Sequence, residues 1–215
     1  MKYLSFLVLP FLFAIKGCAQ GGSQQSNSAT DRQAGGRCEG CEAIFESPIA
    51  FNKLGWTDTL PGFAETEPKL VVGGRVFQKD GKTPAANVVL YFYHTDRAGN
   101  YPQKGDETGW GKRHGYLRGW VKTNHEGAYR FYTFRPASYP NSNNPQHIHI
   151  TVKEEGVVAY YIDDFLFADD PLLSEGEINQ LQKRGGSGIL RPVLKDGIYM
   201  AERNIVLGLN VPGYQ

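Results

Sequence analysis

The sequence has no block of basic residues and, beyond its first residues, no long apolar run. Its 23 lysines and arginines balance 22 aspartates and glutamates, so the formal net charge is +1 and nucleic-acid binding has no support. Without a second apolar run, we expect that the mature protein does not span a membrane. What is abundant is glycine, proline, tyrosine and phenylalanine, which fits short strands with many turns better than a helical bundle.

The N-terminus predicts an export signal over residues 1–18. Lys2 precedes a short apolar run that ends at Ile15, and small residues follow. Residues 15–18, Ile-Lys-Gly-Cys, resemble a bacterial lipoprotein box, which predicts cleavage before Cys18 and acylation of its sulfur. The expected location is therefore outside the cytoplasm, with the protein held to a membrane by lipid alone. Because Lys16 is unusual in such a box, ordinary secretion is the alternative.

The rest of the chain predicts a flexible linker followed by one domain. Residues 19–36 are rich in Gly, Ser, Gln and Asn, and residues 37–215 are long enough for a sizeable core. Cys38 and Cys41 stand in Cys-Glu-Gly-Cys, and in an exported protein a local disulfide is the favoured interpretation. A zinc half-site lacks a second Cys/His pair, and a thioredoxin-like motif lacks its βαβ surroundings.

Strand-like segments follow one another at short intervals, with no internal repeat. The expected strands are residues 70–77, 88–93, 119–123, 128–133, 146–152, 157–162 and 203–209. The turn at residues 124–127 predicts a hairpin between the third and fourth of them. One helix is expected near residues 175–183, because Ser174 and Glu177 can form a capping box and Gly185-Gly186 can end it. The sequence therefore predicts an all-β sandwich of mostly antiparallel strands, with long loops and one short helix.

Two histidines stand one residue apart in the expected strand 146–152. His147 and His149 would therefore point to the same face of that strand. Such a pair is either two imidazole ligands aimed at one metal ion or two structural side chains, and the spacing leaves these interpretations about even. His94, His114 and His125 lie in or beside turn-like sequence, where we expect exposure to solvent.

Two other metal sites fit part of this pattern. Glu154 stands at the spacing of the third cupin ligand, but the framing glycines and the last histidine of a cupin are missing. An iron site with two histidines and one carboxylate would need Asp163 or Asp164, which spacing does not support.

Tyr101 and Tyr139, both upstream of the histidine pair, complete a more specific pattern. With them, the chain from about Gly73 to Pro171 resembles the intradiol ring-cleavage dioxygenases, the family of catechol and protocatechuate dioxygenases. The motifs that carry this resemblance, in order, are Gly74-Arg75-Val76, Gly99-Asn100-Tyr101-Pro102, Leu117-Arg118-Gly119, Tyr129-Arg130-Phe131-Tyr132-Thr133, Tyr139-Pro140, Pro145-Gln146-His147-Ile148-His149 and Asp170-Pro171-Leu172.

The resemblance implies a mononuclear, non-haem Fe(III) site with Tyr101, Tyr139, His147 and His149 as its ligands. Phenolates are hard anionic donors that suit a ferric ion, and imidazoles suit iron as well. It further implies that a catechol-type diol binds iron, that Tyr139 leaves the metal and takes up a proton, and that O2 opens the ring between the two hydroxyls. Both oxygen atoms then enter a muconate-type product.

Two positions depart from the family pattern. Asn144 stands where the family usually has an arginine, and Asp164 stands where it usually has a glutamine. We expect both positions at the substrate, with Arg118, Arg113 or Arg135 as candidates to supply the missing positive charge.

A non-catalytic module is the alternative function. Transthyretin-like and carboxypeptidase-regulatory-like β-sandwich domains share the pattern between Gly74 and Phe131, but they give no reason for the two tyrosines and the histidine pair. The sequence leaves the oligomeric state open.

Overall fold

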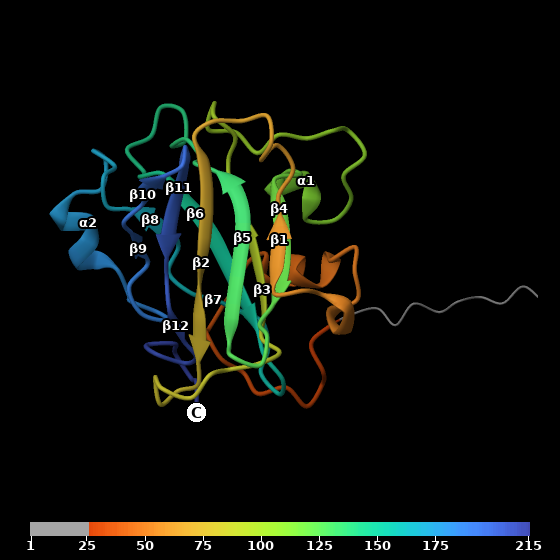
Figure 1. Ribbon diagram of the computed structural model, residues 1–215. Coiled ribbons are helices and arrows are strands. Elements are labelled where there is room, and N and C mark those ends of the chain that lie inside the picture. Colours follow the sequence, from red (N-terminus) through yellow and green to blue (C-terminus); the bar gives the residue numbers. More distant parts are fainter. Residues whose placement is uncertain (1–25) are drawn as a thin grey trace, which may run out of the picture.

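The computed structural model describes residues 26–215, so the export signal and Cys18 lie outside the described residues. Two six-stranded sheets form a sandwich (Figure 1). The first sheet contains β1 (Thr57–Thr59), β5 (Ala128–Phe134), β2 (Lys69–Phe77), β11 (Ile198–Glu202) and β10 (Val193–Lys195), with β12 (Ile205–Val206) also paired to β2. The second contains β4 (Arg118–Lys122), β3 (Val89–Tyr93), β6 (His147–Lys153), β8 (Phe165–Phe167) and β9 (Ile189–Leu190), with β7 (Tyr160–Tyr161) also paired to β6. The predicted all-β sandwich is therefore confirmed.

The main core lies between the two sheets. Alternate apolar residues of β2, such as Leu70 and Val72, share one buried cluster with Leu90 of β3. Phe92 of β3 stacks on Phe131 of β5, with 3.9 Å between the ring centroids. Burying each side chain of this size contributes about 1.5–3 kcal/mol, so these contacts hold the sheets together.

The expected hairpin between residues 119–123 and 128–133 is wrong. β4 pairs with β3, whereas β5 pairs with β2 and β1 in the other sheet. The Asn124 side chain still forms a tight turn, since its Oδ1 accepts from the backbone N–H groups of Glu126 and Ala128. The turn thus carries the chain from one sheet to the other, since β4 and β5 belong to different sheets. Both faces of β4 are covered: Val121 is buried in the core between the sheets and Trp120 on the outer side.

The helices are short. α2 (Glu175–Gln180) begins at the expected capping box of Ser174 and Glu177, where each side chain accepts from the other residue's backbone N–H. α1 (Gly111–His114) and the 3-10 helices η1 (Cys41–Glu46) and η2 (Phe51–Lys53) were not expected, because such short segments show no helical period. No helix within residues 26–215 is long and apolar enough to cross a membrane.

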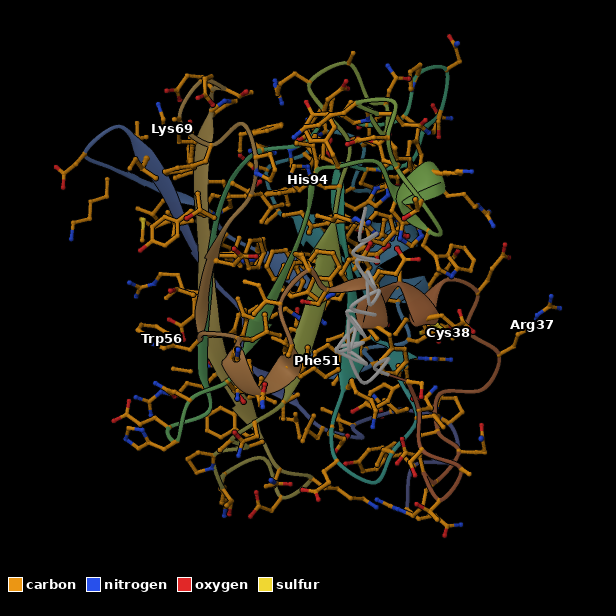
Figure 2. The ribbon with its side chains drawn as sticks, turned by 90° about the vertical axis from the view of Figure 1, so that its right-hand side faces the viewer. Arg37, Cys38, Phe51, Trp56, Lys69 and His94 are labelled. Carbon is orange, nitrogen blue, oxygen red and sulfur yellow. A yellow bond between two sulfur atoms is a disulfide. The ribbon has the colours of Figure 1, made fainter. Side chains whose placement is uncertain are left out.

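A second, smaller core lies under η1 on the outer side of β3 and β4. Ile44 of η1 packs there with Tyr91 and Trp120, and the Trp120 indole N–H donates to the Ile44 carbonyl at 2.8 Å. A disulfide joins Cys38 to Cys41 at the start of η1. Cys38 lies against this side of the sandwich in Figure 2. The disulfide therefore closes a local loop within the segment that covers the outer face of β3 and β4.

Residues 26–36, expected to belong to a flexible linker, pack against the domain. Arg32 forms a β-bridge with Val157, and Ala34 is buried. The Gly35 N–H donates to the Pro212 carbonyl at 2.8 Å, and the Arg32 guanidinium donates to the Gln215 carbonyl at 2.7 Å. Neither hydrogen bond depends on an apolar side chain, so composition gave no sign of them. The domain therefore begins before residue 37.

Candidate metal centre

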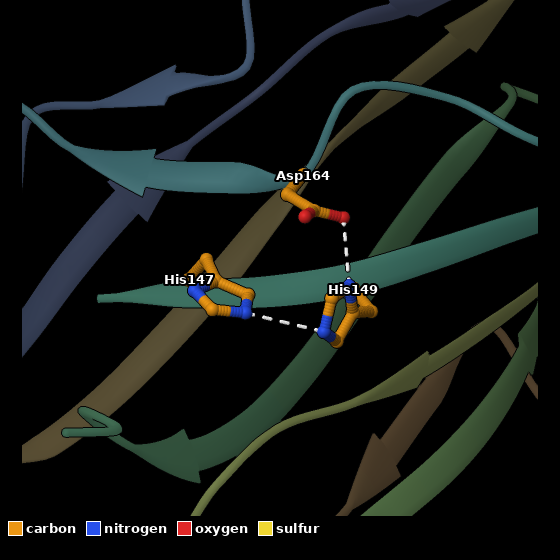
Figure 3. Close-up of side chains that lie close together, drawn as sticks. All are labelled: His147, His149 and Asp164. Atoms are coloured by element: carbon orange, nitrogen blue, oxygen red, sulfur yellow. Dashed lines mark hydrogen bonds and ion pairs between the residues drawn. The ribbon is translucent and has the colours of Figure 1, made fainter. Parts of the chain in front are cut away.

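Four donor atoms converge at one end of the sandwich. They are the hydroxyl oxygens of Tyr101 and Tyr139 and the Nε2 atoms of His147 and His149. Tyr101 Oη lies 2.9 Å from His149 Nε2, and Tyr139 Oη lies 3.1 Å from His147 Nε2 and 3.2 Å from His149 Nε2. The two Nε2 atoms are 3.2 Å apart (Figure 3), and the two hydroxyls are in contact. The structure thus brings together all four side chains that the sequence singled out as ligands.

The two tyrosines come from loops that contact each other. Tyr101 follows β3 and Tyr139 follows β5, so they leave strands of different sheets. A Cβ atom at Gly99 would lie only 2.1 Å from the Ser138 carbonyl oxygen, and the φ angle of Gly99 is +80°. Glycine at this position therefore allows the two tyrosine loops to touch. The Ala137 N–H donates to a backbone carbonyl of the first loop at 3.1 Å, which adds to the same contact.

The histidines are held with their lone pairs toward the cluster. His147 Nδ1 lies 2.7 Å from the Pro145 carbonyl, which can only accept, so Nδ1 carries the proton and Nε2 does not. His149 Nδ1 lies 3.1 Å from Asp164 Oδ1 (Figure 3), which assigns the proton of His149 in the same way. Burial and the neighbouring His149 lower the pKa of His147, so this ring is neutral near pH 7. Two imidazole lone pairs at this separation suit a shared cation.

The phenol groups also suit a cation of high charge. Burial raises the pKa of Tyr101, as does its hydrogen bond with Tyr139, and burial raises the pKa of Tyr139 too. Without a cation, both phenols therefore stay protonated at neutral pH. A bound metal ion reverses this preference, because it favours the phenolate. Two hard oxygen donors with two imidazole nitrogens match the ligand chemistry of ferric iron.

Two further aromatic rings form a wall beside His149. The Tyr93 ring stacks on the His149 ring at 4.5 Å between centroids, and on the His114 ring at 3.8 Å with only 5° between the planes. Tyr91 Oη lies 2.8 Å from His114 Nδ1. Sequence reasoning missed Tyr93 and His114. The signal was the alternation in strand 88–93, which places Tyr91 and Tyr93 on the same face.

The expectation of exposure was wrong for two of the remaining histidines. His114 is 7% exposed, and burial lowers its pKa to about 4. His94 is fully buried near this end of the sandwich (Figure 2), where its ring nitrogens lie 2.7 Å from the Thr95 carbonyl and 2.6 Å from the Thr133 hydroxyl. The turn-like sequence around His94 and His114 predicted exposure, but segments distant in sequence cover both rings. His125 is exposed, as expected.

None of the carboxylates weighed from the sequence joins the four donors. Asp164, His147 and His149 each have a ligand atom within 4.8 Å of the others, but Asp164 contacts Nδ1 of His149, the ring nitrogen opposite the one that faces the cluster (Figure 3). The Asp163 carboxylate accepts from the backbone N–H groups of Lys183 and Arg184. Glu154, the cupin candidate, accepts from the hydroxyls of Tyr160 and Tyr214 instead.

The three candidate arginines are engaged in ion pairs. Arg118 donates to Glu46 at 2.7 Å, Arg135 donates to Asp169 at 2.7 Å, and Arg113 donates to Glu39. Asn144 is exposed in the loop before β6, where its backbone N–H donates to the Ser142 hydroxyl. The structure therefore does not show Arg118 or Asn144 among the groups that contact the four donors.

Comparison with known proteins agrees with this geometry. The dioxygenase family profile matches residues 57–192. The protocatechuate 3,4-dioxygenase beta chain of Burkholderia cepacia is 32% identical over 118 residues, which are 52% of this chain and 50% of that protein. The chain thus spans about half the length of this curated relative.

Solved structures share the fold. The dioxygenase domain of a dioxygenase carbohydrate-binding protein fusion from Streptomyces sp. SirexAA-E superposes with a TM-score of 0.53 at 20% identity, covering 83% of this chain and 97% of that one. The intradiol ring-cleavage dioxygenase of Tetranychus urticae gives 0.54 at 18% identity, covering 75% and 90%. Because the family match covers more than half of the sequence, this chain belongs to the intradiol ring-cleavage dioxygenase family.

Proposed function

We propose that this protein is a non-haem Fe(III) dioxygenase that cleaves a catechol-type ring between its two hydroxyls and forms a muconate-type product. The observation that carries the proposal is the convergence of two phenol oxygens and two imidazole nitrogens on one point. The names of the relatives, which include protocatechuate and catechol dioxygenases, support the substrate class.

Tyr101, Tyr139, His147 and His149 would hold the ion. When bound, ferric iron supplies a Lewis acid that ionises the phenols and activates a chelated diol toward O2. Two phenolates offset two of its three positive charges, which favours the ferric over the ferrous state. The protons on the Nδ1 atoms of both histidines stay with their protein partners, so each ring keeps its orientation.

Tyr139 is the residue to which we assign proton uptake. Its hydroxyl contacts the other three donors, so a proton released by a diol hydroxyl at this point reaches Tyr139 Oη directly. Tyr139 lies in a loop, whereas both histidines lie on β6, so the tyrosine has more freedom to withdraw. Tyr93 packs against one face of the His149 ring and keeps water away from it.

The non-catalytic alternative is not favoured, because a binding module would not require these four donors to converge. We further propose export, with the mature protein held by a lipid on Cys18 or released by ordinary secretion. The Cys38–Cys41 disulfide supports export, since such bonds persist in oxidising compartments. Mass spectrometry of Cys18 in the processed protein tests this.

Reconstitution with a ferric salt tests the function. The phenolate–iron pair should give a visible charge-transfer band, and oxygen uptake with catechol should follow. Tyr139→Phe should shift the band and reduce oxygen uptake by about 100-fold, the size expected for loss of a proton-transfer group. Tyr199→Phe, on β11 and outside the four donors, is the matched control and should change neither. A colourless, iron-free protein, or an unaltered Tyr139→Phe variant, would refute the proposal.

A further inference from the structure

We propose that Asp164 makes this site selective for uncharged catechols and against catechols whose ring carries an anionic substituent. The inference rests on the proposed function, because it concerns the diol that the same four donors would face. Asp164 thereby becomes a specificity-determining residue that acts through its charge.

The position of Asp164 places a negative charge close behind the metal centre. Its Oδ1 lies 3.1 Å from His149 Nδ1, so one imidazole ring separates the carboxylate from the converging donors (Figure 3). The Asp164 side chain is 36% exposed, and that of His149 is 24% exposed, so water screens this charge only in part. Burial is the largest cause that raises the pKa of Tyr101, Tyr139 and Tyr93, and the charge of Asp164 raises the pKa of all three as well. The field of Asp164 thus reaches the whole site.

Within residues 26–215, the nearby arginines are engaged with other groups and offset this charge only in part. Arg113, Arg118 and Arg135 each pair with an acidic side chain, as described above. Arg97, in the loop that carries Tyr101, donates to two backbone carbonyls of the Tyr139 loop.

Two more arginines lie deeper in the protein. Arg184 is 6% exposed and Arg203 is 3% exposed, so neither guanidinium is accessible to a molecule that enters from solvent. Arg203 donates to the Asp163 carbonyl, and Arg184 donates to the Gly35 carbonyl. Arg203 offsets part of the Asp164 charge from the interior, but it cannot pair with a substituent on a bound ring.

The consequence is a penalty on a second anion in the site. A diol without charged substituents meets no repulsion beyond that of its own ionised oxygens. A ring carboxylate adds a negative charge near that of Asp164, which should weaken binding on the order of tenfold at a separation of about 10 Å. The Burkholderia cepacia relative is named for protocatechuate, a catechol with a carboxylate, so the inference separates this chain from it.

Binding without turnover gives the test. Iron(III)-loaded protein is titrated under anaerobic conditions with 4-methylcatechol and with 3,4-dihydroxybenzoate, followed by the tyrosinate band and by calorimetry. We expect the uncharged diol to bind at least about tenfold more tightly. Asp164→Asn should bring the ratio of the two dissociation constants close to 1, since the amide oxygen can still accept from His149. Glu126→Gln, in an exposed turn at the other end of the sandwich, changes the net charge equally and should leave the ratio unchanged.

Salt dependence provides a second measurement that needs no variant. Raising the salt concentration from 0.05 to 0.5 M (on the order of a threefold shorter Debye length) should bring the ratio of the two dissociation constants closer to 1 in the unaltered protein. Equal binding of both diols by the unaltered protein would overturn the inference about Asp164 but not the proposed function. So would an unchanged ratio of the two dissociation constants in an Asp164→Asn variant that binds iron. If neither diol perturbs the band, the proposed function fails together with it.

Discussion

Replacing Gly99 with alanine should damage iron binding through the contact between the two tyrosine loops. The new Cβ atom would lie 2.1 Å from the Ser138 carbonyl oxygen and 2.9 Å from Pro140 Cδ. Ordinary carbon–oxygen contacts are about 3.3 Å, so one of the loops must move by about 1 Å. Gly99 is two residues before Tyr101, and Ser138 directly precedes Tyr139, so the displacement reaches both phenols.

The expected size follows from two contributions. An alanine at a φ of +80° costs about 1–2 kcal/mol, and the added methyl group in a closely packed contact costs about 1–3 kcal/mol. Donor atoms must stay within about 0.5 Å of their productive positions, so a shift of about 1 Å exceeds that tolerance. We therefore expect iron affinity to fall by about 10–100-fold, the loss typical of a disturbed support around a metal ligand.

The control for Gly99→Ala is the same substitution at Gly197, which has a similar backbone angle but room for the added Cβ atom. Gly197 lies in the turn between β10 and β11 with a φ of +81°, and a Cβ atom there would meet nothing within 4 Å. Gly197→Ala should therefore lose stability in urea unfolding without losing iron affinity, measured by titration of the tyrosinate band. Equal iron affinity in the two variants would refute the argument that Gly99 sets the distance between the tyrosines.

Two further predictions concern stability. Loading with ferric iron should raise the unfolding midpoint by about 10 °C when free iron is about 1,000 times its dissociation constant, because the ion binds only the folded chain. Tyr139→Phe should reduce this rise. Calorimetry that shows the same midpoint with and without iron would contradict the prediction. Burial lowers the pKa of His94 to about 4, below about 6.5 in the unfolded chain, so its contribution is fully present above pH 6.5 and is lost as the pH falls toward 4. The free energy of unfolding should thus drop by up to about 3 kcal/mol over that range, and His94→Gln should flatten its pH dependence in urea titrations, whereas an equally steep dependence in the variant would exclude His94 as the cause.

Local patterns predicted the longer strands, because alternation and turn chemistry are written in neighbouring residues. They failed for the short ones: the expected strands 157–162 and 203–209 shrink to β7 and β12, and β1 and β8–β11 were not expected. Residues 70–77 and 88–93 agree with β2 and β3 to within one residue at each end, and Ser174 caps α2 as expected. The turn at residues 124–127 misled, since the Asn124 hydrogen bonds are the same whether the chain returns along its own sheet or crosses to the other one. Only the partner strand decides this, and the partner is distant in sequence.

For the site, the sequence named four side chains that the structure places together, and their role as iron ligands stays a prediction. Their order along the chain was informative because each tyrosine follows a strand and the histidines share one. The orientation of Asp164 could not be predicted, since it depends on which ring nitrogen of His149 faces the cluster. The burial of His114 depends on the loop around Gly40, which lies more than 70 residues earlier.

The C-terminus lies beside residues 32–35, and this contact gives the molecule a polarity. Arg32 contacts Gln215, and the Arg32 N–H donates to the Gly156 carbonyl at the turn that follows β6. The histidines stand at the other end of β6, among the loops at the top of Figure 1, while the C-terminus lies at the bottom. A bead or fused domain attached at the C-terminus would therefore sit at the base of the molecule. The entrance for a diol and O2 would face the surrounding medium, so immobilising the protein through its C-terminus should not obstruct diffusion to its site.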